Sequence, residues 1–546
     1  MSITVGRFLV ELLQANDIDT VFGIPGVHTL ELYRGLAATD LRHILVRHEQ
    51  GAGFAADGYA RISGRAAVAF VISGPGVTNI LTAVAQAHSD SVPLLVIAST
   101  PAQASLGKQW GVLHELANQR DLAANVFGVA RSARTAADVR DHLRVCLAAL
   151  RAGRPRPAYL EIPLDLLAEP TDLRAARFAS PAFSPRPAPA QVEAAIRLLA
   201  RAERPLIITG GGARGASAEL GELVDLLDAF LVTTAAGKGV LAEAHPANLG
   251  ASLPYPQTQA LAASADVVLA VGTEIAETDL YTGLRLPLAG QMIRIDIDAT
   301  KLVDHYGADV ALWGDARGTL QTINRGLARR SGWRAAVGGA AATRAAIDAS
   351  FSPAARVQSS VIGAIRGALP PDGVVFSDMT QIAYLGNYAY PVDAPGRWFH
   401  PSGYGTLGFA LPAALGATIA APSRAVLALV GDFGLQFTLG ELMSAVEQGV
   451  SLPIVVWNNG ALGQIRDDMV AAGIPPIGVV GRNPDFLALA AAYGAAGMRV
   501  RDLAALREGI EGALGRSGPT LIEIVPTDFS TTATMTTATT TSRTSA

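Results

Sequence analysis

The sequence is poor in cysteine and in long apolar runs. Cys146 is the single cysteine among 546 residues, which excludes an internal disulfide framework and fits a reducing compartment. An apolar helical pattern surrounds it, so we expect a core position. No uninterrupted apolar stretch reaches the roughly 18 residues of a membrane span, and Arg7 and Glu11 interrupt the first amphipathic pattern. We therefore expect no membrane segment, no signal peptide and a cytoplasmic protein.

Charge is also scarce, and lysine almost absent. Charged residues make up 16% of the chain, the net charge is -4, and only three residues are lysine. Arginine carries most of the positive charge and is scattered, which argues against a nucleic-acid partner. Half of the residues are hydrophobic, so a large core is easy to build. A chain of this length is expected to form about three domains.

Strand and helix signals alternate through three regions of the chain. Alternation of this kind predicts an α/β protein with three doubly wound domains, each a parallel sheet covered by helices on both faces. Segments rich in Ala, Gly or Pro separate the regions and are interpreted as linkers, at 169–190 and 338–352. The predicted domains span residues 1–168, 190–333 and 353–528. Residues 529–546 are almost entirely Thr, Ser and Ala and predict a disordered tail, because they cannot bury a core.

The most informative stretch covers residues 426–459. Its first apolar run, 426–430, predicts a buried parallel strand, followed by the turn Gly431–Gly434, a helical pattern and a second strand that ends at Asn459. Asp432 and Asn459 then lie at the carboxyl edge of a sheet, where such folds bind ligands. Carboxylate, amide and carbonyl oxygens suit Mg2+, and the turn glycines and the helix start favour a diphosphate. An ordinary strand–helix–strand unit with an aspartate in its turn is the competing interpretation.

This unit resembles the fingerprint of the thiamine diphosphate enzymes, Gly-Asp-Gly followed further on by Asn-Asn. Phe433 stands where the fingerprint has its second glycine. The resemblance implies that Mg2+ is bound by Asp432, Asn459 and the carbonyl of Ala461. It also implies that the cofactor is held by residues Thr380, Gln381, Gly431, Asp432, Phe433, Gly434, Asn459 and Leu462.

Glu49 is the main catalytic candidate. It follows an apolar strand and begins an Ala/Gly-rich helix in the segment RHEQGA. The resemblance implies that Glu49 shares a proton with N1′ of the cofactor pyrimidine. It further implies that the carbonyl of Gly405 accepts from the 4′-amino group and that Leu407 supports the bent cofactor. The alternatives are a surface glutamate favoured by the helix dipole and a core leucine.

The resemblance covers the whole chain except the tail and implies an order of pyrimidine-binding, central and diphosphate-binding domains. Because Glu49 and Asp432 belong to different domains, the resemblance implies a cofactor bridging two subunits, hence a homodimer or homotetramer. In the central region, Gly210–Gly212 resembles a dinucleotide turn only weakly, since the full G-x-G-x-x-G spacing is missing. A structural central domain is therefore favoured over one that binds FAD.

Three local segments resemble one branch of the family, the 5-guanidino-2-oxopentanoate (2-ketoarginine) decarboxylases of arginine catabolism. These segments are 21–33, 106–115 and 461–469. The resemblance implies non-oxidative decarboxylation of this 2-oxo acid to 4-guanidinobutanal. The residues expected around the substrate are His28, His114 and Gln464, although a lone histidine is more often structural.

The guanidinium tail of such a substrate favours a carboxylate partner. Glu115, Asp467 and Asp468 are candidates among which the sequence does not choose, and each could equally be a solvated surface acid. Two other functions stay open. One is an acetolactate synthase-like carboligase that joins 2-oxo acids or aldehydes. The other is a cofactor-binding protein without catalysis.

Overall fold

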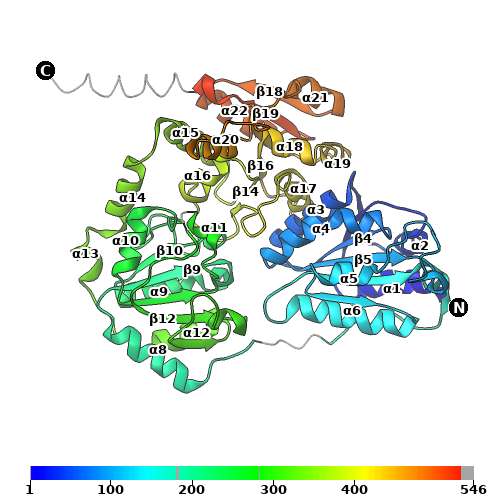
Figure 1. Cartoon of the computed structure of the whole chain (residues 1–546), viewed down its shortest axis with the longest axis horizontal. Coiled ribbons are helices and arrows are strands. Elements are labelled where there is room, and N and C mark those ends of the chain that lie inside the picture. The colour runs from blue at the N-terminus through cyan, green and yellow to red at the C-terminus, as the bar shows by residue number, and fades with distance from the viewer. Residues whose placement is uncertain (1, 180–183, 282, 530–546) are drawn as a thin grey trace.

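The computed structural model describes residues 2–179, 184–281 and 283–529. Within these ranges, three parallel sheets form three α/β units with helices on both faces of each sheet (Figure 1), which confirms the predicted class. Residues 530–546 of the predicted tail lie outside the described part, and Phe529, its first residue, is buried. None of the described helices is long and apolar enough to cross a membrane.

The N-terminal unit holds a six-stranded sheet in the order β3-β2-β4-β5-β7-β6. β4, β5 and β7 are buried along their whole length, as strands covered on both faces must be. Cys146 is fully buried against this sheet, as expected. Its strands are β2 (Thr20–Gly23), β3 (Arg42–Leu45), β4 (Ala67–Val71), β5 (Leu94–Thr100), β6 (Val129–Ser132) and β7 (Ala158–Pro163). Its helices are α1 (Val5–Ala15), α2 (Leu30–Leu36), α3 (Glu49–Ser63), α4 (Pro75–Ser89), α5 (Gln119–Ala124), α6 (Ala136–Arg151) and α7 (Leu164–Ala168).

A short antiparallel pair, β1 (Ile3–Thr4) with β8 (Pro170–Thr171), ties the start of the chain to the segment that leaves this unit. The first predicted linker therefore begins with a paired strand and ends where α8 starts, at Pro189. Residues 180–183 of that linker lie outside the described part. The domain boundaries themselves stay a prediction.

The central unit is a five-stranded parallel sheet in the order β10-β9-β11-β12-β13. Its strands are β9 (Pro205–Thr209), β10 (Phe230–Thr233), β11 (Val267–Val271), β12 (Gln291–Asp296) and β13 (Val310–Trp313). Its α-helices are α8 (Pro189–Arg201), α9 (Ser217–Leu227), α10 (Pro256–Ser264), α11 (Glu277–Leu280), α12 (Ala316–Arg325), α13 (Trp333–Ala336) and α14 (Gly339–Ala349). Short 3-10 turns add η2 (Gly211–Ala216), η3 (Ala235–Gly237) and η4 (Ala299–Leu302), and η1 (Gln103–Ser105) belongs to the N-terminal unit.

The segment at 338–352, interpreted as a linker, is largely helical. Residues 339–349 form α14, which buries Ala340 and Ile347. Ala has the highest helix propensity, so an Ala-rich stretch that also carries an apolar face folds as a helix. Ser352 then caps the next helix by accepting from the backbone N–H of Ala355.

The C-terminal unit contains a six-stranded parallel sheet in the order β15-β14-β16-β17-β19-β18. Its strands are β14 (Val374–Ser377), β15 (Trp398–Phe399), β16 (Val426–Gly431), β17 (Pro453–Trp457), β18 (Ala496–Val500) and β19 (Thr520–Ile524). Its helices are α15 (Pro353–Ala368), α16 (Gln381–Ala389), α17 (Ala410–Ala420), α18 (Asp432–Phe437), α19 (Glu441–Glu447), α20 (Gly463–Ala471), α21 (Phe486–Tyr493) and α22 (Leu503–Leu514). β16 and β17 are direct neighbours, so their ends share one edge.

The N- and C-terminal units are joined by the close crossing of α3 and α17. A Cβ atom added at Gly58 would lie 1.9 Å from the carbonyl oxygen of Ala413, and one at Gly416 would lie 1.8 Å from that of Ala55. Only glycine permits two helix backbones to approach this closely. Because α3 begins at Glu49, this contact fixes the position of Glu49 relative to the C-terminal unit.

Glu441, at the start of α19, makes a second connection to the same place. Its carboxylate accepts from the backbone N–H groups of Arg47 (3.0 Å) and His48 (3.0 Å) and from the hydroxyl of Ser444. The side chain is buried, and burial raises the pKa of this carboxyl. Glu441 thus holds the backbone just before Glu49 against the C-terminal unit.

Candidate functional site

Glu49 is the first residue of α3, at the carboxyl edge of the N-terminal sheet. His48 precedes it in an extended conformation and caps the helix by accepting from the N–H of Gln50. Oε2 of Glu49 accepts from the amide of Asn79 on α4, at 2.9 Å. A Cβ atom on Gly76 would lie 3.4 Å from Oε1. The half-buried carboxylate is therefore held beside the start of α4.

Two predicted histidines lie on the same edge. The rings of His28 and His114 meet edge to face with centroids 5.1 Å apart, and Nδ1 of His28 pairs with the hydroxyl of Ser73. Burial and, to a lesser extent, the neighbouring His114 lower the pKa of His28. The carbonyl oxygen of His114 is 2.6 Å from where a Cβ on Gly74 would be. Since Gly74 directly precedes α4, the histidines, Ser73 and Glu49 form one cluster around the start of that helix.

Asp432 begins α18 at the end of β16 and is 2% exposed. Its Oδ2 accepts from the backbone N–H of Gly460 (2.9 Å) and from the amide of Asn483 (2.6 Å). Burial raises the pKa of this carboxyl, and the hydrogen bonds from Asn483 and the backbone oppose that rise. Asn483 also donates to the side-chain oxygen of Asn458. It therefore links the ends of β16 and β17, a role the sequence pattern missed because Asn483 lies in a loop far along the chain.

Asn459 lies beside Asp432 at the end of β17. Its Oδ1 accepts from the N–H of Ala461 (3.1 Å), and its Nδ2 donates to Oε1 of Gln381 (3.2 Å). A Cβ atom on Gly463 would lie 2.4 Å from the same Gln381 oxygen. Gln381 in turn donates to Asp467 on α20. The predicted metal and cofactor residues of the C-terminal unit are thus brought together at one edge.

The departure from the fingerprint at Phe433 has a local explanation. Residues 432–437 form α18, and Phe433 is not among the described residues with a positive φ, so its backbone does not require glycine. The side chain points at the loop that follows α20, where a Cβ atom on Gly481 would lie 2.6 Å from the ring. Unlike the position of Phe433, the positions of the two turn glycines leave no room for a side chain. A Cβ atom on Gly431 would lie 2.9 Å from Thr380, and one on Gly434 would lie 2.9 Å from Asp378.

Gly405 and Leu407 lie in the loop between β15 and α17. Gly405 is exposed with φ of +71°, and Leu407 is half-buried. The carboxylate of fully buried Asp378 accepts from the N–H of Gly408 (2.9 Å), which fixes the end of this loop. Burial raises the pKa of Asp378 to about 6, against several backbone N–H donors. The anchoring role of Asp378 is a contact that the sequence did not predict.

The remaining candidates Leu462 and Gln464 mark the start of α20. Leu462 donates its N–H to the carbonyl of Val479 (2.8 Å), and Gln464 is exposed and donates to Asp468 (2.9 Å). Within the described part of this single chain, no hydrogen bond or ion pair joins the cluster of Glu49, His28 and His114 to the cluster around Asp432 and Asn459. The predicted site residues thus form two half-sites.

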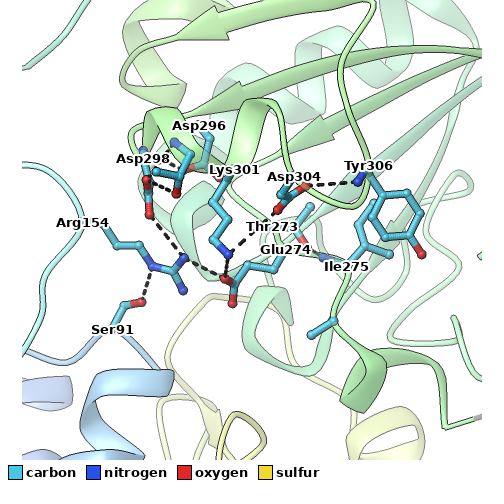
Figure 2. Close-up of polar contacts among 12 residues, drawn as sticks. Ser91, Arg154, Thr273, Glu274, Ile275, Asp296, Asp298, Lys301, Asp304 and Tyr306 are labelled. Carbon is cyan, nitrogen blue, oxygen red and sulfur yellow. Dashed lines mark hydrogen bonds and ion pairs between the residues drawn. The ribbon is translucent and has the colours of Figure 1, made fainter. Parts of the chain in front are cut away.

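A cavity of about 370 Å³ lies where the three units meet, lined in part by Gly210–Gly212, Arg61, Arg214 and His400. Figure 2 shows the polar network at its border between the N-terminal and central units. Arg154 pairs with Glu274 (2.9 Å), and Lys301 pairs with the same carboxylate (2.6 Å). Burial acts to raise the pKa of Glu274, but hydrogen bonds from Arg154 and Lys301 outweigh it and hold the pKa at about 2. None of the predicted site residues lines this cavity.

The second half-site has the chemistry that Mg2+ and a diphosphate require. Asp432 and Asn459 offer side-chain oxygens, and Ala461 adds a backbone carbonyl, a hard oxygen set that suits Mg2+. No cluster of three or more His, Cys, Asp or Glu side chains forms a different metal site in the described ranges. The start of α18 adds a helix N-terminus, which favours an anion. The residues present therefore fit a magnesium diphosphate.

Comparison with known proteins agrees with this geometry. Descriptions of the thiamine pyrophosphate enzymes match three parts of the chain: the N-terminal TPP binding domain at residues 3–122, the central domain at 192–323 and the C-terminal TPP binding domain at 378–524. The chain is 48% identical over 527 residues to the probable 2-ketoarginine decarboxylase AruI of Pseudomonas aeruginosa, covering 96% of this chain and 94% of that protein.

More distant relatives include acetolactate synthases. That of Mycobacterium bovis is 31% identical over 91% of this chain and 84% of its own length. The large subunit of isozyme 1 from Escherichia coli is 29% identical, over 95% and 93%. With all three domain descriptions matched and this extent of similarity, the chain belongs to the thiamine pyrophosphate enzyme family.

Proposed function

We propose that the protein is a thiamine diphosphate- and Mg2+-dependent decarboxylase that converts 5-guanidino-2-oxopentanoate to 4-guanidinobutanal and CO2. The observation that carries this proposal is the 48% identity, along 96% of the chain, with the probable 2-ketoarginine decarboxylase. The two half-sites support it, because they supply a carboxylate for proton control and an oxygen set for the metal.

Asp432, Asn459 and the carbonyl of Ala461 bind Mg2+ in this proposal. Oδ2 of Asp432 already accepts two hydrogen bonds, which orients the carboxylate. The further cofactor-binding residues are Thr380, Gln381, Gly431, Phe433, Gly434 and Leu462, with Gly405 and Leu407 on the neighbouring loop. Bound thiamine diphosphate supplies the nucleophilic carbon and the electron sink that the loss of CO2 requires.

Glu49 controls the proton at the other end of the site. Its carboxylate would hold a proton against the pyrimidine ring nitrogen of the bound cofactor, and Asn79 keeps the carboxylate oriented through the 2.9 Å hydrogen bond. Burial lowers the pKa of His28, so its ring is neutral at pH 7 and can accept a hydrogen bond from, or donate one to, the substrate. His114 contacts the His28 ring, and Gln464 is the proposed substrate residue of the other half-site.

A homodimer is the smallest assembly that joins the two half-sites, and a homotetramer is a pair of such dimers. Exposed apolar residues border both half-sites in the single chain, as surfaces that are covered on association do. Val27, Trp110 and Leu113 flank the histidines, at 63%, 65% and 58% exposure. Ile477 and Val480 follow α20, at 75% and 66%. A cytoplasmic location stays a prediction.

The direct test is a panel of 2-oxo acids assayed for CO2 with added thiamine diphosphate and Mg2+. The proposal predicts CO2 and aldehyde from 2-ketoarginine, and loss of this activity when a chelator removes the metal. Pyruvate turned over to acetolactate, with no CO2 from 2-ketoarginine, would reject it.

A second candidate is an acetolactate synthase-like carboligase. The relatives near 30% identity carry that name, and the cavity between the three units offers space for a second ligand. Flavin absorbance in the purified protein, together with a ligated product from two 2-oxo acids, would favour this function. A protein that binds the cofactor but releases no CO2 from any 2-oxo acid would instead be a binding protein.

A further inference from the structure

The three acidic residues that could receive a guanidinium tail have different surroundings. Glu115 lies next to His114 in the first half-site, and Asp467 and Asp468 lie on α20 in the second. The substrate's charge requires an acid whose own charge is not already neutralised and whose oxygens a substrate can reach. The contacts of each residue decide between them.

Asp467 is already engaged. Its Oδ1 accepts from both Nε (3.0 Å) and a terminal nitrogen (2.8 Å) of Arg466. Its Oδ2 accepts from Gln381 at 2.8 Å. One cation and one amide thus occupy both oxygens, so Asp467 serves to orient Gln381 rather than to bind a second guanidinium.

Glu115 is enclosed by its own loop. Oε2 accepts from the N–H of Gly111, four residues earlier, at 2.8 Å. Oε1 is buried and has no hydrogen-bond partner within the described residues. An atom with no exposed surface cannot contact a substrate unless the loop opens, so Glu115 is the weaker candidate.

Asp468 differs from both. It is exposed, its carboxylate accepts a hydrogen bond from the neutral amide of Gln464 (2.9 Å), and it makes no ion pair in the part of the chain that the structure describes. It shares a helix face with Gln464, since residues four apart are neighbours on a helix. Asp468 therefore carries an accessible negative charge that no neighbouring cation cancels.

α20 carries this charge away from the residues expected to hold the metal and diphosphate. The helix begins at Gly463, where an added Cβ would lie within 2.5 Å of both Gln381 and Asn459. With a rise of about 1.5 Å per residue, Asp468 lies about 7.5 Å farther along the axis. In 2-ketoarginine the guanidinium carbon is five bonds from the reacting carbonyl carbon, about 6 Å in an extended chain.

We propose that Asp468 is the residue that selects the guanidinium tail, with Gln464 orienting its carboxylate. This inference rests on the proposed decarboxylation of 2-ketoarginine and adds the determinant of its substrate class. Removing the charge should harm the guanidinium substrate far more than an uncharged 2-oxo acid of similar length, such as 2-oxohexanoate.

The test compares kcat/KM for these two substrates in the full-length enzyme with cofactor and Mg2+. For Asp468→Asn, the preference for 2-ketoarginine should fall about 10- to 150-fold, the range that corresponds to losing a hydrogen bond to a charged group. Asp468→Glu should retain part of the preference. Asp141→Asn, the same change at an exposed acid of α6 that pairs with Arg140, is the matched control and should leave the ratio unaltered.

Ionic strength gives a second readout that a merely structural role would not move. In the wild type, KM for 2-ketoarginine should rise with added salt because screening weakens the attraction, and in Asp468→Asn this dependence should largely disappear. If Asp468→Asn keeps the wild-type ratio, or if Asp467→Asn or Glu115→Gln lowers it instead, the inference is wrong while the proposed function stands. No CO2 from 2-ketoarginine in the wild type would overturn both.

Discussion

The close crossing of α3 and α17 makes Gly58 a sensitive position for both stability and activity. In Gly58→Ala the new Cβ would lie 1.9 Å from the carbonyl oxygen of Ala413. Cβ atoms essentially never approach another heavy atom closer than 3.0 Å, so this contact would be 1.1 Å too short. The contacted atom is backbone, so it cannot rotate away. The two helices must separate by more than 1 Å.

Two opposing effects set the size of the loss. Alanine gains about 1 kcal/mol over glycine inside a helix, whereas overpacking costs about 1–3 kcal/mol and more when backbone has to move. We expect the cost of overpacking to exceed the gain in helix propensity, with a net loss of stability of about 2 kcal/mol. Because α3 begins at Glu49, the displacement should also reduce decarboxylation.

Gly512→Ala is the matched control. Gly512 is an exposed position of α22 where an added Cβ meets no heavy atom within 4 Å. It should raise the thermal midpoint slightly through propensity alone. The assay compares midpoints of thermal unfolding and CO2 release across wild type and both variants, since a multidomain chain does not give one unfolding free energy. A Gly58→Ala protein that unfolds at or above the wild-type midpoint with full activity would refute the packing argument.

Three further predictions concern single side chains. Glu49→Gln should lower kcat by about 10²- to 10⁴-fold without changing the thermal midpoint, and full activity in this variant would contradict the proposed proton control. Cys146 is buried, and burial raises the pKa of its thiol to about 12, so a thiol reagent should label it only on unfolding; rapid labelling of the native protein would show otherwise. Lys238 donates to the carbonyls of Asn387 and Tyr388, and burial lowers its pKa from 10.5 to about 8. Between these values the unfolded chain binds more protons than the folded one, so the contribution of Lys238 to stability should rise with pH. Lys238→Met should reduce that slope in thermal midpoints measured from pH 8 to 10.5, and an unaltered slope would contradict the burial effect.

Local pattern was sufficient to predict the strand tips that carry the site. β16 (Val426–Gly431) covers the expected strand at 426–430. Asp432 and Asn459 follow the ends of the neighbouring strands β16 and β17, because a buried parallel strand has a recognisable apolar run. The helix within the segment 338–352 was not predicted, because Ala and Gly content alone does not show whether a connecting segment is helical. The helix buries two apolar residues seven positions apart, Ala340 and Ile347, and this helical spacing was the feature that could have predicted it.

Contacts between segments far apart in sequence could not be predicted. Glu441 accepts from the backbone beside Glu49, and Asn483 joins the ends of β16 and β17. Neither residue lies in a motif, since each acts only through its position in the folded chain. The choice among the acidic candidates likewise needed the structure, because Arg466 neutralises Asp467 and leaves Asp468 unpaired by any cation among the described residues.

We propose that Glu49 of one subunit and Asp432 of another complete each site. Glu49→Gln and Asp432→Asn, each inactive alone, should be unfolded together, mixed in equal amounts and refolded. In a symmetric dimer, random pairing makes half of the molecules mixed, and each mixed dimer has one intact site of two. We expect CO2 release at about a quarter of the wild-type rate. A mixture that stays inactive although mixed dimers have formed would show that the two residues do not meet across subunits.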